Sequence, residues 1–248
     1  MKAAAVAVSA LLVMSASALA QPSGPGMRDG RGGRIARVAQ PGEVAAADIA
    51  ASLLAQEEGR WKSFKEHGAD GAIMFVPQRV DAKQWLKDSD EPANAIDWSP
   101  HEIWSSCDGS LAISGGGWTK PDGTQGWYAS AWERQRDGEY RWTMELSGES
   151  ANAGEAPILI RSHTPGCNSV MPRRDGTGGP PDRKRRNNDK PRSDIGHPYA
   201  ISRDETMRWD VETGDDCTRH LTVRFREDSG WNDPVLDRVA AYGQGCAN

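Results

Sequence analysis

Among the side chains that could do chemistry, His101 is distinguished by its neighbours, because it lies between Trp98 and Trp104. An imidazole titrates near neutral pH, so a histidine in an aromatic rim can act as a general base. The alternative is a strand-edge histidine that faces solvent or a local partner, which does not require other catalytic residues around it. His101 is therefore the candidate catalytic residue of the sequence, with both interpretations open.

Five carboxylates accompany the apolar segments and are candidates for proton transfer: Asp70, Asp81, Asp97, Glu102 and Glu145. Acid–base chemistry next to a carbonyl needs a carboxylate base and a buried acidic donor around an apolar pocket. Asp81 stands where a short helix should begin, and we expect it to cap that helix. Glu145 alternates with apolar residues along its segment, so we expect it to lie outside the core. No pair of these carboxylates is assigned the roles of base and donor.

Other reactive patterns are missing from the sequence. Ser105, Ser106 and Ser110 have no neighbouring His–Asp set of a nucleophile motif. The histidines are scattered and the cysteines form no Cys-x-x-Cys, so we expect no metal. The glycine-rich stretch at 21–42 lacks the flanking strand and helix of a phosphate-binding loop, and we expect no cofactor. The net charge of −5 predicts no specific nucleic-acid partner.

The first residues have the three parts of a secretory signal peptide: Lys2, an apolar run that ends at Met14, and small residues at Ala18 and Ala20. The apolar run is shorter than the about 20 residues that a membrane span needs. A membrane anchor or a buried helix is the alternative. We expect residues 1–20 to be removed and the protein to be exported to the periplasm or the extracellular space.

The cysteines are four in number: Cys107, Cys167, Cys217 and Cys246. An even number in an exported chain favours disulfides, and three pairings are possible. An antiparallel arrangement of the last strands would bring Cys217 close to the chain after Val239. This favours Cys217–Cys246 and leaves Cys107–Cys167, with free thiols as the alternative.

The chain is poor in apolar residues, with 37% hydrophobic content and a mean hydropathy of −0.68, yet it contains 10 Trp. Eight of these lie between Trp61 and Trp142. Because tryptophan is large and costly to expose, this stretch should form the main core. Residues 21–42 are expected to be a flexible leader.

The spacing of apolar residues predicts an amphipathic helix over 43–67 that ends at Gly68. The apolar face of this helix should carry Ile49, Leu53, Leu54, Trp61 and Phe64. A strand over 72–76 and a brief helix over 81–87 should follow.

Four strands are then predicted, over 100–107, 110–118, 125–134 and 139–146. Asp-Gly turns between alternating segments are strong hairpin signals, so these strands should form an antiparallel meander. The last strand should present one apolar face, made of Tyr140, Trp142, Met144 and Leu146. We expect the helix and a one-sided sheet to close over this face.

The character of the chain changes after Gly148. One more strand is predicted over 156–162, followed by a loop over 165–193. Its segment 173–192 has eight basic and three acidic residues, which suits contact with an anionic surface or, alternatively, a solvated loop. A three-stranded ribbon from 206 to 240 should pack on the first domain, because three strands need another surface to be stable.

Two motifs carry a family resemblance. The segment from Asp70 to Pro77 follows a long helix, and the hairpin from Trp132 to Trp142 places an Asp-Gly turn between aromatic residues. With the Trp85 helix between them, this order resembles the nuclear transport factor 2-like superfamily. It is most similar to the bacterial SnoaL-like and DUF4440-like branch.

The resemblance covers roughly residues 43–148 and implies a fold. It implies an α+β fold with a cone-like, curved antiparallel sheet packed on N-terminal helices. Residues 149–205 would be a loop-rich basic linker, and residues 206–248 a C-terminal three-stranded β extension. The superfamily includes ketosteroid isomerase, small epoxide hydrolases, dehydratases and many proteins without known activity. Its base-and-donor set cannot be carried over to this sequence residue by residue.

Folds of this superfamily often enclose a pocket. The residues expected to line it are Trp61, Phe75, Trp85, His101, Trp104, Trp127 and Trp142. The alternative is that these aromatic residues are simply core.

Three functions remain open for such a protein. The first is an exported domain that binds a small apolar ligand or a protein partner without catalysis. The second is an acid–base enzyme of the isomerase or lyase type. The third is an envelope interaction protein that works through the basic segment 173–192. A homodimer is also open, since cone folds commonly pair through their sheets.

Overall fold

The structure is a computed structural model, and it describes residues 38–92, 96–151, 154–167 and 196–241. The expected signal peptide, the leader up to residue 37, the basic segment 173–192 and Cys246 lie outside the described residues. Within the described ranges, none of the helices has the length and apolar character of a membrane span.

The described residues form three helices and twelve strands. In chain order these are α1 (Pro41–Glu58), α2 (Arg60–His67), β1 (Gly68–Phe75), β2 (Arg79–Asp81), α3 (Ala82–Asp88), β3 (Asp97–Ser105), β4 (Leu111–Thr119), β5 (Gln125–Arg134), β6 (Tyr140–Glu149), β7 (Arg161–His163), β8 (Tyr199–Ile201), β9 (Met207–Thr213), β10 (Arg219–Glu227), β11 (Gly230–Trp231) and β12 (Leu236–Ala240).

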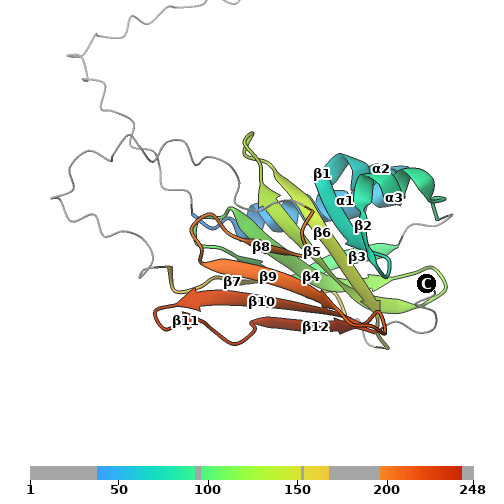
Figure 1. Cartoon of the computed structure of the whole chain (residues 1–248). Helices are drawn as coiled ribbons and strands as arrows, with labels where there is room; N and C mark the ends of the chain where they lie inside the picture. Colours follow the sequence, from blue (N-terminus) through green and yellow to red (C-terminus); the bar gives the residue numbers. More distant parts are fainter. Residues whose placement is uncertain (1–37, 93–95, 152–153, 168–195, 242–248) are drawn as a thin grey trace, which may run out of the picture. The chain divides into compact units, whose positions relative to one another are not determined.

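Seven strands make the larger sheet, in the order β2-β1-β6-β5-β4-β3-β7 (Figure 1). The predicted meander is its centre, since β3, β4, β5 and β6 pair in sequence as antiparallel neighbours. The two pairs that flank the meander are parallel, β1 with β6 and β7 with β3. The smaller sheet contains β8 to β12, with β10 between β9 and β12.

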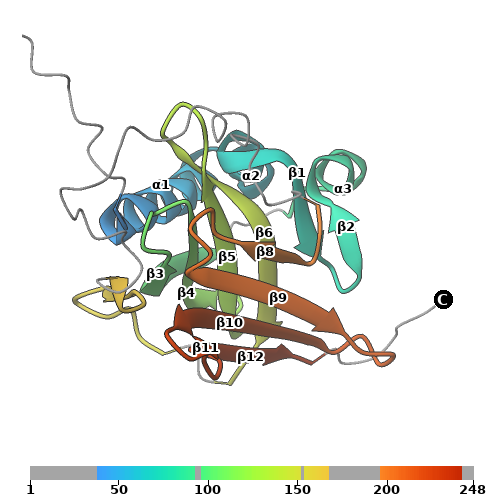
Figure 2. The same cartoon turned by 60° about the vertical axis from the view of Figure 1, so that its left-hand side comes forward.

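The larger sheet is covered on both faces (Figure 2). Side chains that include Phe64, Trp132 and Trp142 form one apolar cluster with the helices. Side chains that include Ile113 and Leu221 form a second cluster, which joins the two sheets. The α+β class is therefore confirmed, while the expectation of a one-sided sheet is wrong. The C-terminal strands supply the second cover, and their packing on the first sheet agrees with the prediction.

A β-bulge explains why the predicted apolar face of β6 is wrong. Trp142 pairs with Trp132 and Met144 pairs with Ala131, so Thr143 is an extra residue in β6. One extra residue turns every later side chain to the opposite face. Tyr140 and Trp142 therefore face the helices, whereas Met144 and Leu146 face the second sheet. Glu145 follows the bulge and lies on the helix side, where it was not expected.

The predicted single helix over 43–67 is divided at Gly59. This residue has φ 100°, a conformation that glycine adopts more readily than other residues. The buried face also differs from the prediction, since Ile49 and Leu53 are 41% and 58% exposed. The face of α1 that is buried consists of Val44, Ala45, Asp48, Ala51, Ser52 and Ala55. Small residues let α1 approach the sheet closely, and they place one carboxylate in the interior.

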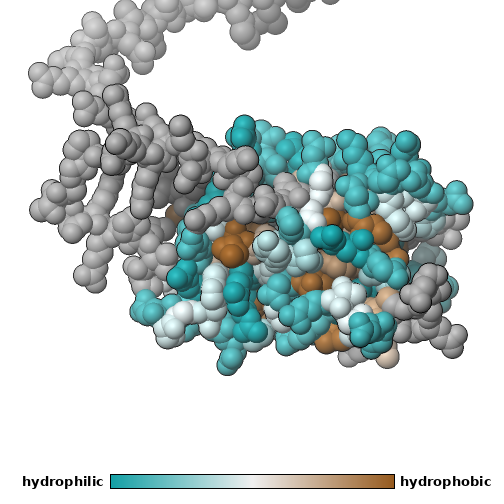
Figure 3. Space-filling model, viewed as in Figure 1, coloured by the Kyte–Doolittle hydropathy of each residue, from teal (hydrophilic) through white to brown (hydrophobic). Residues whose placement is uncertain are grey.

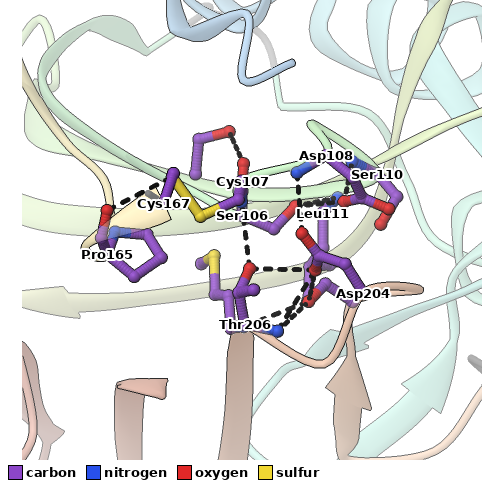
Figure 4. The surroundings of a disulfide bond; sticks show 12 residues. Ser106, Cys107, Asp108, Ser110, Leu111, Pro165, Cys167, Asp204 and Thr206 are labelled. Carbon is purple, nitrogen blue, oxygen red and sulfur yellow. Dashed lines mark hydrogen bonds between the residues drawn. A yellow bond between two sulfur atoms is a disulfide. The ribbon is translucent and has the colours of Figure 1, made fainter. Parts of the chain in front are cut away.

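A corner between the sheets contains the one disulfide whose two ends are both described. Cys107 is bonded to Cys167 with a Cα–Cα distance of 5.5 Å, which is the pairing that the sequence left for these residues (Figure 4). The Cys107 N–H donates to Thr206 Oγ1 over 2.9 Å, and the Asp108 N–H donates to Asp204 Oδ2 over 2.8 Å. The β3–β4 turn is therefore fixed both to the chain after β7 and to the turn between β8 and β9.

The end of the chain follows the predicted ribbon in outline. Arg219 at the start of β10 pairs with Ala240 at the end of β12, as the antiparallel arrangement requires. Cys217 is disulfide-bonded, and its expected partner Cys246 lies outside the described residues. The predicted strand over 156–162 is only the short β7, and β8 was not predicted.

Candidate functional site

A cavity of about 620 Å³ lies between the helices and the helix-facing side of the larger sheet. Its aromatic walls are Phe64, Phe75, Trp98, Trp118, Trp132 and Trp142, and Tyr128 adds a hydroxyl. The volume falls within the roughly 300–1,000 Å³ of sites that hold drug-sized molecules. On the face of the molecule in Figure 3, apolar surface among the coloured residues forms separate patches within a largely hydrophilic surface. Six of the ten tryptophans are buried, and three of these six, Trp118, Trp132 and Trp142, line the cavity.

Asp48 of α1 reaches the cavity and is almost completely buried, with 1% exposure. Its carboxylate accepts hydrogen bonds from Trp98 Nε1 over 2.9 Å and from the Tyr128 hydroxyl over 2.7 Å. Burial raises the pKa of Asp48, while hydrogen bonds from Tyr128, Trp98 and Ser114 act against that rise. One carboxylate thereby joins α1 to β3, β4 and β5.

Glu145 of β6 is the second carboxylate of the cavity. Burial raises its pKa to about 8, although a hydrogen bond from the Ser130 hydroxyl and the charge of Arg60 lower it. The negative charge of Asp48 raises it further. Glu145 is therefore mainly protonated at neutral pH, and it can lose this proton when the pH rises slightly above neutral.

Two further groups complete the polar part of the cavity. Burial raises the pKa of Tyr128 well above its usual value, and the neighbouring Asp48 adds to this. The Tyr128 hydroxyl thus stays a hydrogen-bond donor to Asp48. Burial lowers the pKa of Arg60, and the charge of Glu145 opposes this. The guanidinium lies 4.9 Å from the centroid of the Phe64 ring.

One edge of the cavity is bounded by charged residues of both sheets. Lys120 and Glu149 form an exposed ion pair with 3.5 Å between Nζ and Oε1. Arg219 of β10 is buried and donates to the Ala240 carbonyl over 3.2 Å. The cavity thus has apolar walls inside and paired polar groups at this edge.

The structure separates the residues that were predicted to line a pocket. Phe75 and Trp142 line the main cavity. Trp61 and Trp85 pack against each other edge to face, with ring centroids 5.2 Å apart, and do not line it. The prediction of one common pocket is therefore wrong for this set, and the walls include other tryptophans.

His101, Trp104 and Trp127 line a second, smaller cavity of about 220 Å³. His101 is the extra residue of a bulge between Pro100 and Glu102 of β3. Burial lowers its pKa, while Glu102 raises it and Arg161 lowers it. His101 does not line the main cavity, which contains Asp48 and Glu145.

The carboxylates named from the sequence have different positions. Asp81 caps α3 as predicted, accepting from the Gln84 N–H over 2.8 Å. Asp70 and Asp97 are exposed, and Glu102 pairs with Arg161 and with His163. The remaining one, Glu145, is the only member of this set in the main cavity.

Asp48, Arg60 and Tyr128 were not proposed from the sequence. The signal for Asp48 is the run of small residues at spacings of three and four in α1, which marks the buried face better than the larger aliphatic residues do. Arg60 directly follows the glycine that divides the helices, and no sequence pattern points to it. Tyr128 occupies a strand position next to Trp127, and only the pairing of the strands decides which of the two faces the helices.

No family model matches the chain, and no curated protein matches it. The comparisons therefore add no family to the geometry described above.

Proposed function

We propose that this protein is exported, that its first domain is a cone-like member of the nuclear transport factor 2-like superfamily, and that its main cavity binds a small, largely apolar molecule. One observation carries the binding proposal: a cavity of about 620 Å³ with six large aromatic walls and a few polar groups. Sites for small organic molecules have this composition, because apolar walls supply affinity and a few polar groups fix orientation. The chain order that resembles the superfamily supports the fold assignment.

Binding can be tested without knowing the natural ligand. We expect naphthalene- or indole-sized aromatic compounds to raise the melting temperature and to change tryptophan fluorescence. Ser147→Phe, which places a ring in the cavity, should abolish both effects. Ser229→Phe, which places the same ring at an exposed turn, should leave them unchanged. Equal responses of the two variants would show that the compounds bind elsewhere.

A second function, acid–base catalysis of the isomerase or lyase type, is favoured by Glu145. A carboxyl group with a pKa of about 8 in an apolar cavity can take a proton from carbon and return it at another atom. In this mechanism ionised Glu145 accepts the proton, and Arg60 stabilises the negative charge that develops on the substrate. Tyr128 keeps Asp48 in place and takes no part in the transfer.

The two functions differ in one variant. Glu145→Gln should retain binding of an aromatic ligand in either case. If the protein is an enzyme, this variant should lose at least about a hundredfold in turnover of a substrate, which is the usual contribution of a general base. A screen with carbonyl compounds that carry an acidic C–H would identify such a substrate, and the absence of turnover across the screen would favour the binding protein.

Export has its own test. When the full sequence is expressed in a bacterial host, mass spectrometry of the processed protein should find Gln21 as the first residue. A product that retains Met1 and stays with the cytosolic fraction would contradict export and leave the cavity proposal untouched.

A further inference from the structure

Arg60 is a cation in the cavity without a hydrogen-bond acceptor. Among the described residues its guanidinium has no partner within hydrogen-bond or ion-pair distance, and its Nε is buried. A buried donor that stays unpaired costs free energy, since its hydrogen bonds to water are lost and not replaced. An occupant of the cavity with an acceptor group would remove this cost.

The aromatic neighbours of Arg60 do not meet this need. Its Cζ lies 4.9 Å from the centroid of the Phe64 ring and 5.7 Å from that of the Trp61 ring. An aromatic ring attracts the cation but offers no carbonyl or carboxylate oxygen to its N–H groups. The rings therefore hold the side chain without replacing the hydrogen bonds that its N–H groups lose on burial.

The nearby carboxylates do not neutralise Arg60 either. Glu145 interacts with Arg60 electrostatically, but within the described part of the chain the two side chains form no direct ion pair. The Glu145 carboxyl group accepts a hydrogen bond from the Ser130 hydroxyl instead. Asp48 is already used by Trp98 and Tyr128. With Glu145 protonated at neutral pH, no carboxylate among the described residues forms a direct ion pair with the Arg60 guanidinium.

The other cations of the cavity are engaged. Lys120 pairs with Glu149, and Arg219 donates to backbone carbonyls of Ala240 and Ala241. One available cation suits one negative charge, and the planar N–H edge of an arginine matches the two oxygens of a carboxylate. The aromatic walls suit a flat apolar body.

We propose that the ligand of this cavity is a small aromatic or otherwise flat apolar monocarboxylate, and that Arg60 binds its carboxylate. This inference rests on the proposed binding function and specifies its ligand class. A neutral analogue of the same shape should bind less well, because it leaves the N–H edge of Arg60 without a charged acceptor.

The test uses 2-naphthoate and its uncharged isostere 2-naphthamide, with isothermal titration calorimetry on the mature protein at pH 7. We expect wild type to bind the carboxylate about tenfold to a hundredfold more tightly than the amide, the range for a charge-assisted hydrogen bond. In Arg60→Met this preference should disappear, while the amide binds as before. Arg60→Lys should keep part of it. Lys120→Met removes a cation from the edge of the same cavity and should change the preference by less than about twofold, since an exposed pair contributes little.

Each outcome bears on a different statement. Equal affinity of wild type for the two compounds would overturn the monocarboxylate inference and retain the cavity as a binding site. Failure of both compounds to bind would overturn the binding function itself. Loss of the preference in Lys120→Met but not in Arg60→Met would show that the edge, not Arg60, recognises the charge. If Arg60→Met does not fold, the wild-type ratio and Arg60→Lys still decide the matter.

Discussion

The two faces of the seven-stranded sheet are built from the same strands but have different interiors. The side that meets the second sheet is packed with aliphatic and aromatic side chains, among them Ile113, Met144, Leu146 and Leu221, all fully buried. The side that meets the helices has small residues on α1, large aromatic residues on the strands, and the cavity between them. Both faces are buried, so burial alone does not distinguish them.

The difference places a continuous packed core on one face of the sheet and the cavity of the proposed binding function on the other. Close packing recovers dispersion and hydrophobic energy from every atom, whereas a hollow gives up part of both. The helix side also retains two carboxylates and an arginine whose burial is costly. Because the other face supplies a continuous core, the molecule can tolerate this cost where the cavity lies.

The largest effect is expected on the packed face. Leu221→Ala should lower the free energy of unfolding by about 3–5 kcal/mol, because it opens a hole in a core that cannot fully collapse. Chemical denaturation at pH 7 measures this. Leu53→Ala makes the same change on α1, where the side chain is 58% exposed, and should stay within about 0.5 kcal/mol. Similar losses in both variants would mean that the outer face of α1 is also core.

The next effect concerns the cavity and depends on pH. The pKa of Glu145 is raised from 4.5 to about 8 in the folded protein, so the folded state holds a proton that the unfolded state releases between these values. Wild type should therefore lose stability as the pH rises from about 4.5 to about 8. Glu145→Gln cannot ionise, and at pH 9 it should be about 2–4 kcal/mol more stable than wild type, with no difference at pH 4.

Denaturation curves at several pH values measure this effect. Glu149→Gln, an exposed change on the same strand, is the control and should follow the pH profile of wild type. A Glu145→Gln profile parallel to that of wild type would show that Glu145 is ionised and solvated across the range. The helix side of the sheet would then lack the buried, protonated carboxyl group that distinguishes it from the packed side.

The sequence predicted the elements better than it predicted the faces. Asp-Gly turns define the hairpins of β3 to β6, because such turns depend on local residues only. The bulge at Thr143 depends on the partner strand, and it exchanges the two faces for the rest of β6. Strict alternation predicts that Glu145 points away from the core. This prediction is wrong because the sequence does not mark the bulge at Thr143, which lies before Glu145.

The candidate site was harder still to predict, for a related reason. Large aliphatic residues in α1 suggested a buried face through Ile49 and Leu53, but the helix turns its small residues inward to approach the sheet. Tertiary packing overrides a local apolar pattern when the partner surface already carries large aromatic side chains. Whether Asp48 lines the cavity depends on the orientation of α1, which the sequence pattern did not predict.

The smallest predicted effect tests how the helix side is held to the sheet. Tyr128→Phe removes the hydroxyl that donates to Asp48 over 2.7 Å and leaves the ring in place. The loss of one donor to a buried carboxylate should cost about 1–2 kcal/mol in urea denaturation at pH 7 and should raise the pKa of Asp48. Tyr199→Phe, at a 51% exposed position, should cost less than about 0.5 kcal/mol. A neutral Tyr128→Phe would mean that Asp48 does not tie α1 to β5, and the hydrogen bonds of α1 to β3, such as that from Ser52 Oγ to the Trp98 carbonyl over 2.7 Å, would then hold the helix to the sheet.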